Sequence, residues 1–104
     1  MRVAALVGEL MFASRVQALL ERAGHEVQLV ADPSAIGDAD VVVADVMGID
    51  PVAVVACGVP ALGIFNHTAP DVRDAALAAG FAMVVPRSRF VREAADLVVR
   101  VAAT

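Results

Sequence analysis

The sequence contains no Lys, Tyr or Trp and only one cysteine, Cys57. A single cysteine excludes a disulfide within the chain and a cysteine-based metal site. Because free cysteine usually packs as a small apolar side chain, we expect Cys57 to be buried on a short helix. The eight basic residues are all arginine and face twelve acidic ones, which gives a net charge of −4. Because there is no basic stripe, we expect no nucleic-acid partner.

Long uninterrupted hydrophobic segments are also lacking. The longest stretch without a charge covers residues 51–70, but Pro51, Pro60 and Pro70 divide it, so we interpret it as a helix followed by a strand. The apolar run at the start is too short for a signal peptide and Glu9 interrupts it. We therefore expect a cytoplasmic protein without a membrane partner. The abundance of Ala, Val and Arg is typical of a bacterial chain encoded by GC-rich DNA.

What is present is an apolar fraction of 60% over 104 residues, which fits one domain, 1–104, with one core. Short apolar runs that predict strands alternate with patterns that predict helices. The expected strands are 2–7, 25–30, 40–46, 59–65 and 81–85. The expected helices are 10–24, 50–58, 70–80 and 89–103, with one or two helical turns in 32–40.

This alternation predicts an α/β fold with a parallel sheet covered by helices on both faces. We expect a flavodoxin-like, doubly wound sheet of five strands in the order 2-1-3-4-5. The second and third helical segments, 32–40 and 50–58, are shortened. In such sheets, ligands bind beyond the carboxyl ends of the strands, where the winding reverses.

The stretch "ADVVVADVMG", residues 39–48, ends an apolar strand on the carboxylate of Asp45. A buried carboxylate is costly unless it is paired or solvated, so this strand end is expected to face a cleft. Polar or small residues follow the other strands at the same edge. The predicted cleft residues are Gly8, Glu9, Asn66, His67 and Arg87.

The segments "ADVVVAD" and "LAAGFAMVVPRS" resemble those of a response-regulator receiver domain, and the likeness covers nearly the whole chain. Receivers carry paired acids after the first strand, a phosphate-accepting Asp after the third, Thr or Ser after the fourth and Lys-Pro after the fifth. The resemblance implies that Asp45 is in the phospho-acceptor position. It also implies that Glu9 and Asp45 are the candidate ligands for Mg²⁺, a cation that prefers oxygen ligands.

The chain departs from that pattern at five positions. Gly8 stands where the first acid belongs, Phe65 replaces the hydroxyl, and Arg87 and Ser88 replace Lys-Pro. Val84 occupies the position of the aromatic switch residue. The lost acid lowers the expected affinity for Mg²⁺, and a planar guanidinium is not equivalent to a lysine ammonium. We therefore interpret the chain as a degenerate, receiver-like domain.

Each site residue also has a purely structural interpretation. Asp45 can form an ion pair with Arg87 that links two strand ends. Glu9 can be a carboxylate at a helix start, favoured by the helix dipole. His67 can complete a three-ligand site with Glu9 and Asp45, or it can cap the helix that begins near Pro70.

Three functions remain open. The first is a stand-alone signalling module that binds a protein partner or itself without phosphotransfer, and the exposed apolar positions Met11 and Val99 are of the kind found at dimer interfaces. The second is an atypical receiver phosphorylated on Asp45 with Mg²⁺, with Arg87 contacting the phosphoryl group. The third is a flavodoxin-like binder of a small anion or nucleotide. We expect no enzyme, because no nucleophile–base pair is recognisable.

Overall fold

The computed structural model describes residues 1–66 and 68–104, which form five strands and the helices between them. The strands are β1 (Arg2–Leu6), β2 (Glu26–Leu29), β3 (Val41–Asp45), β4 (Ala61–Phe65) and β5 (Met83–Pro86). The helices are α1 (Leu10–Arg22), α2 (Pro51–Val55), α3 (Pro70–Ala79) and α4 (Arg87–Ala102), with a single 3₁₀ turn, η1 (Pro33–Ala35).

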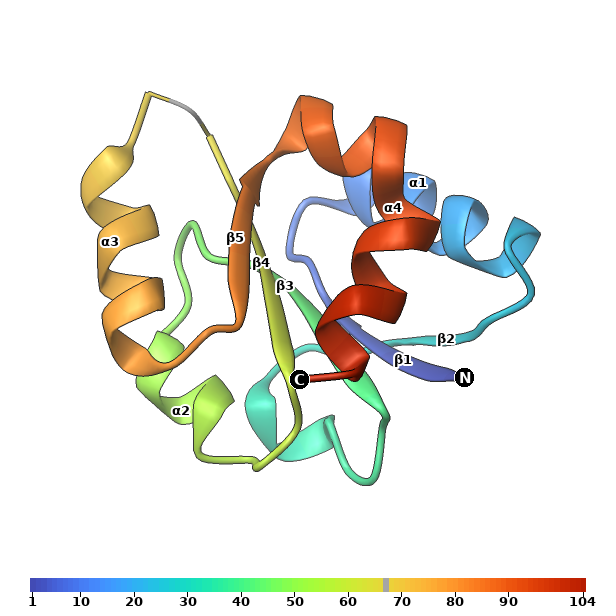
Figure 1. Cartoon of the computed structure of the whole chain (residues 1–104), viewed down its shortest axis with the longest axis horizontal. Coiled ribbons are helices and arrows are strands. Elements are labelled where there is room, and N and C mark those ends of the chain that lie inside the picture. The colour runs from blue at the N-terminus through green and yellow to red at the C-terminus, as the bar shows by residue number, and fades with distance from the viewer. Residues whose placement is uncertain (67) are drawn as a thin grey trace.

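All neighbouring strands pair in parallel, and the sheet order is β2-β1-β3-β4-β5. Figure 1 shows α1 and α4 on one face of the sheet and α2 and α3 on the other. The prediction of a doubly wound, flavodoxin-like sheet with this order is confirmed. Because the winding reverses between β1 and β3, the ends of these two strands border a crevice.

Two apolar layers hold the helices to the sheet. Side chains alternate between the faces of a strand, so Val41 and Val43 pack under α1 and α4, whereas Val42 and Ala44 pack under α2 and α3. Every residue of β3 is buried, which places it at the centre of the sheet. On β4, Gly63 leaves no room for a side chain, because a Cβ there would lie 2.9 Å from Cγ1 of Val46.

The structure corrects several details of the sequence-based expectation. Helix α4 begins at Arg87 rather than at residue 89, because β5 passes directly into it at Pro86 without a loop. Along this helix Phe90 and Leu97 are buried against the sheet side, whereas Ala95 is exposed.

Cys57 is exposed rather than buried. Helix α2 spans only Pro51–Val55, so Cys57 lies in the turn after it and not on a packed helical face. The predicted helix-then-strand interpretation of residues 51–70 agrees with α2 and β4. In the part of the chain that the structure describes, no helix is long and apolar enough to cross a membrane.

Candidate functional site

Asp45 is the last residue of β3 and the only buried charged or polar residue within the described chain, with 6% of its surface exposed. Both of its carboxylate oxygens are engaged. Oδ1 accepts a hydrogen bond from the backbone N–H of Met47 at 3.0 Å, and Oδ2 accepts one from Nη2 of Arg87 at 2.9 Å. The guanidinium of Arg87, which follows the end of another strand, neutralises this carboxylate. The pairing makes a charged residue tolerable at the end of a buried strand.

Arg87 is the first residue of α4, which brings its side chain back over the ends of the strands. Its guanidinium carbon lies 4.3 Å from the centre of the Phe12 ring on α1, so the planar group stacks on the ring while it pairs with Asp45. The side chain of Arg87 is 43% exposed, whereas that of Asp45 is 7% exposed. Nε of Arg87 is buried without a hydrogen-bond partner.

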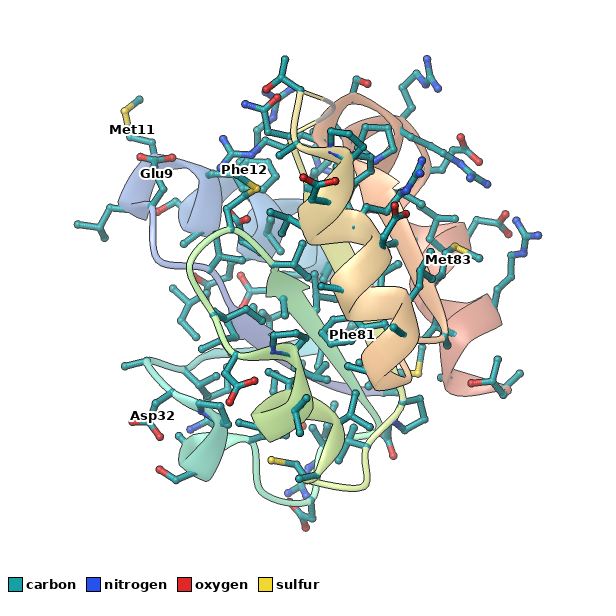
Figure 2. The ribbon with its side chains drawn as sticks, turned by 90° about the vertical axis from the view of Figure 1, so that its left-hand side faces the viewer. Glu9, Met11, Phe12, Asp32, Phe81 and Met83 are labelled. Atoms are coloured by element: carbon teal, nitrogen blue, oxygen red, sulfur yellow. The ribbon has the colours of Figure 1, made fainter. Side chains whose placement is uncertain are left out.

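Glu9 caps α1. Its carboxylate accepts hydrogen bonds from the backbone N–H groups of Met11 at 3.0 Å and Phe12 at 2.8 Å, which are otherwise unpaired at a helix start. In Figure 2, Glu9 and Met11 lie at the free end of α1 and Met11 projects away from the molecule. Both carboxylate oxygens of Glu9 therefore accept hydrogen bonds from the first turn of its own helix.

Residues 9, 45 and 87 are joined in one series of contacts. Glu9 fixes the backbone of Phe12, the Phe12 ring supports Arg87, and Arg87 pairs with Asp45. Glu9 and Asp45 themselves share no hydrogen-bond donor among the described residues. The structural interpretations of Glu9 as a helix-start carboxylate and of Asp45 as the partner of Arg87 match this arrangement.

Two cavities flank the ion pair. Gly8 and Asp45 line one of about 460 Å³, whose other walls are largely apolar, and a Cβ on Gly8 would meet no atom within 4 Å. The space next to the missing first acid is therefore open. Asn66 and Arg87 line the second, of about 490 Å³, together with Ser88. Oδ1 of Asn66 accepts from the backbone N–H of Thr68 at 3.1 Å, as in an Asx turn.

His67 lies outside the described residues, so its proposed roles as a metal ligand or helix cap stay predictions. Within residues 1–66 and 68–104, no group of three or more His, Cys, Asp or Glu side chains could hold a metal ion. At the position of a receiver's magnesium site, Gly8 offers no carboxylate and Glu9 binds its own helix. Asp45 already faces the cationic guanidinium of Arg87. These residues do not fit a magnesium site.

Comparison with known proteins identifies the fold of the chain. Sequence comparison finds no matching family model and no matching curated protein. Among solved structures, the receiver domain of a sensor histidine kinase from Pseudomonas aeruginosa, crystallised with magnesium in its active-site cleft, superposes with a TM-score of 0.81 at 16% identity. The alignment covers 99% of this chain and 98% of that domain. The fold is that of a receiver domain.

Two further structures agree with this receiver-like architecture. A chain from Chloroflexus aurantiacus described as a candidate response regulator has a TM-score of 0.84 at 18% identity, over 99% of this chain and 98% of that one. A LuxR-family DNA-binding response regulator from Staphylococcus aureus has a TM-score of 0.82 at 14% identity, over 97% and 98%. The receiver-like resemblance read from the sequence is confirmed at the level of the fold.

The sequence reasoning missed the stacking of Phe12 on Arg87. Phe12 is buried on α1, and nothing in the local sequence identifies Arg87 as its partner. It also missed Arg15 and Arg92, which line a further cavity with Arg87. Their clustering depends on how α1 and α4 pack together, and the separation of these residues along the chain gives no sign of it.

Proposed function

We propose that the chain is a receiver-like signalling module that works by binding a protein partner or a second copy of itself, without phosphotransfer at Asp45. It is a single unit over residues 1–104, it acts in the bacterial cytoplasm and it has no catalytic activity of its own. The observation that carries the proposal is the ion pair between Asp45 and Arg87, with 2.9 Å between Nη2 and Oδ2.

The ion pair opposes phosphorylation in two ways. An acceptor carboxylate must be accessible to the phosphodonor, and here Asp45 is only 6% exposed and each of its oxygens accepts a hydrogen bond. Phosphoryl transfer also relies on a cation that neutralises the developing charge, usually Mg²⁺ held by several oxygen ligands. Arg87 supplies a positive charge at Asp45. Its guanidinium has only hydrogen-bond donors, so it cannot coordinate Mg²⁺ as an oxygen ligand would.

Two further positions remove the parts of a phosphorylation-driven switch. Phe65, where receivers carry Thr or Ser, is a buried side chain and has no hydroxyl that could follow a phosphoryl group. Val84, where receivers carry the aromatic switch residue, packs against the second apolar layer. Neither side chain has a polar group, and Val84 has no aromatic ring.

Exposed apolar residues beside the site favour a role in binding. Leu10 is 77% exposed and Met11 is 82% exposed at the start of α1, and Met47 after β3 is 39% exposed. Large apolar side chains clustered at one end of a small domain are typical of interaction surfaces. This placement supports a protein partner or self-association.

The test is a phosphorylation assay. Incubate the protein with acetyl phosphate and Mg²⁺ and measure its intact mass, with Asp45→Asn as the site control and Asp50→Asn as a matched exposed carboxylate. We expect no gain of a phosphoryl group in any of the three proteins. A gain in the wild type and in Asp50→Asn that is absent from Asp45→Asn would refute the proposal and establish the alternative, a receiver phosphorylated on Asp45.

A gain-of-function variant sharpens this test. Gly8→Asp with Arg87→Lys restores the missing acid and the lysine, and the open space at Gly8 accepts the new side chain. We expect this variant to bind Mg²⁺ more tightly than the wild type in a calorimetric titration. Equal Mg²⁺ affinity of the two proteins would show that these replacements are not what disables the site.

A further inference from the structure

A third cavity, of about 490 Å³, lies between the N-terminal halves of α1 and α4, on the side of Arg87 that bears the Phe12 stack. Its charged and polar side chains are all able to donate hydrogen bonds, and no carboxylate is among its described lining residues. The lining residues are Phe12, Arg15, Arg87, Ser88, Val91 and Arg92.

The positive charge of this cavity is poorly neutralised. Within the described residues, Arg15 forms no ion pair. Arg92 approaches only Glu93, at 3.8 Å, and that carboxylate oxygen is already 3.3 Å from Arg89. Arg87 uses Nη2 for Asp45. Three guanidinium groups thus gather in one cavity of a chain whose net charge is −4.

A helix start also borders the cavity. Helix α4 begins at the edge of the cavity, its N-cap residue is Pro86, and no side chain caps its first turn. The unpaired N–H groups of a helix start, together with the helix dipole, favour an anion. Ser88, in this first turn, is also a lining residue of the cavity. Guanidinium groups beside a helix start favour the oxygens of a phosphate group.

We propose that this cavity is a binding site for a small phosphate monoester, with the phosphate held by Arg15, Arg92 and the start of α4. The cavity has room for an organic group beyond the phosphate, and Val91 and the edge of Phe12 provide apolar walls for it. Asp45 is not among the described lining residues, although its partner Arg87 is, and binding in the cavity is non-covalent. It therefore does not depend on whether Asp45 can be phosphorylated.

The experiment is a calorimetric titration of the full chain with phenyl phosphate and with inorganic phosphate, at constant ionic strength set by NaCl. We compare the wild type with Arg15→Gln/Arg92→Gln. The matched control is Arg22→Gln/Arg100→Gln, which removes the same charge from the last turns of the same two helices, outside the cavity. Circular dichroism melts confirm that all three proteins fold.

We expect saturable binding to the wild type and to the control, and affinity reduced by about tenfold or more in Arg15→Gln/Arg92→Gln, the scale of losing charge-assisted hydrogen bonds. Tighter binding of phenyl phosphate than of inorganic phosphate identifies a monoester rather than the free ion as the ligand. Absence of saturable binding, or equal loss in the two double variants, would overturn the inference. A phosphorylated Asp45 in the mass assay would refute the proposed function and leave this one standing.

Discussion

Replacing Arg87 by Met removes the partner of a buried carboxylate while keeping an unbranched side chain of similar reach. Fully exposed ion pairs contribute at most about 1 kcal/mol, whereas removing one partner of a fully buried pair costs about 3–5 kcal/mol. Here the side chain of Asp45 is 7% exposed and that of Arg87 is 43% exposed, so water screens one side of the pair. We expect Arg87→Met to lower the free energy of unfolding by about 2 kcal/mol, a value between these limits that includes the lost stacking on Phe12.

Urea denaturation followed by circular dichroism measures this loss. With an m-value of about 1.5 kcal/mol/M, typical of small domains, 2 kcal/mol lowers the midpoint by about 1.3 M. Asp45→Asn keeps a neutral acceptor for the N–H of Met47, and we expect it to cost about 1 kcal/mol. The double variant Asp45→Asn/Arg87→Met removes both charges, so no buried charge is left unpaired. Its free energy of unfolding should therefore be about 1 kcal/mol higher than the sum of the two single losses predicts.

The reasoning fails if Arg87→Met changes the free energy of unfolding by less than about 0.5 kcal/mol, the scatter expected for surface substitutions. It also fails if the losses in the two single variants simply add. Either result would mean that Asp45 is stabilised by solvent rather than by Arg87, and the main argument against phosphorylation would be lost.

Three further predictions concern the packing and the pH dependence of the fold. Val43→Ala on the fully buried β3 should lower the free energy of unfolding by about 2 kcal/mol in the same urea assay, and a change near zero would contradict the central position of that strand. Gly63→Ala should cost about 1–3 kcal/mol, because the added Cβ would lie 2.9 Å from Cγ1 of Val46; unchanged stability would show that this side chain moves aside freely. Burial and, second, the ammonium group of Met1 lower the pKa of His25 below 6.5 in the folded state, so the unfolded chain binds this proton more readily. The contribution of His25 to stability is therefore complete above about pH 6.5 and is lost as the pH falls from there through the lower pKa of the folded state. Melting temperatures at pH 7.5 and 5.5 should therefore differ more in the wild type than in His25→Gln, and an equal difference in the two proteins would rule out this contribution.

The general arrangement of the fold could be predicted because it depends on local patterns. Apolar runs of strand length, separated by helical periodicity, allow few topologies other than a doubly wound sheet. The same topology brings the carboxyl ends of the parallel strands to one edge, so the strand order predicts that Asp45 and Arg87 lie near each other. Glu9 caps α1 through N–H groups two and three residues away, which is also a local interaction.

Other features depend on packing that the local sequence does not determine. The contact between Phe12 and Arg87 requires the exact placement of α1 against α4, two helices far apart along the chain. Helix α4 begins at Arg87 and not at the expected residue 89, and the sequence does not show this because Pro86 is equally suited to end a strand and to precede a helix. Cys57 was assigned to a buried helical face because the expected helix, 50–58, is longer than α2.

The exposed position of Cys57 has a practical consequence. It lies between α2 and β4, where the chain enters a strand, whereas Asp45 and Arg87 lie at the opposite edge of the sheet, where the strands end. As the sole thiol of the protein, it can take a single maleimide fluorophore without any prior mutagenesis. A dye attached there reports on tumbling and complex formation while the entire opposite edge remains unobstructed for ligands.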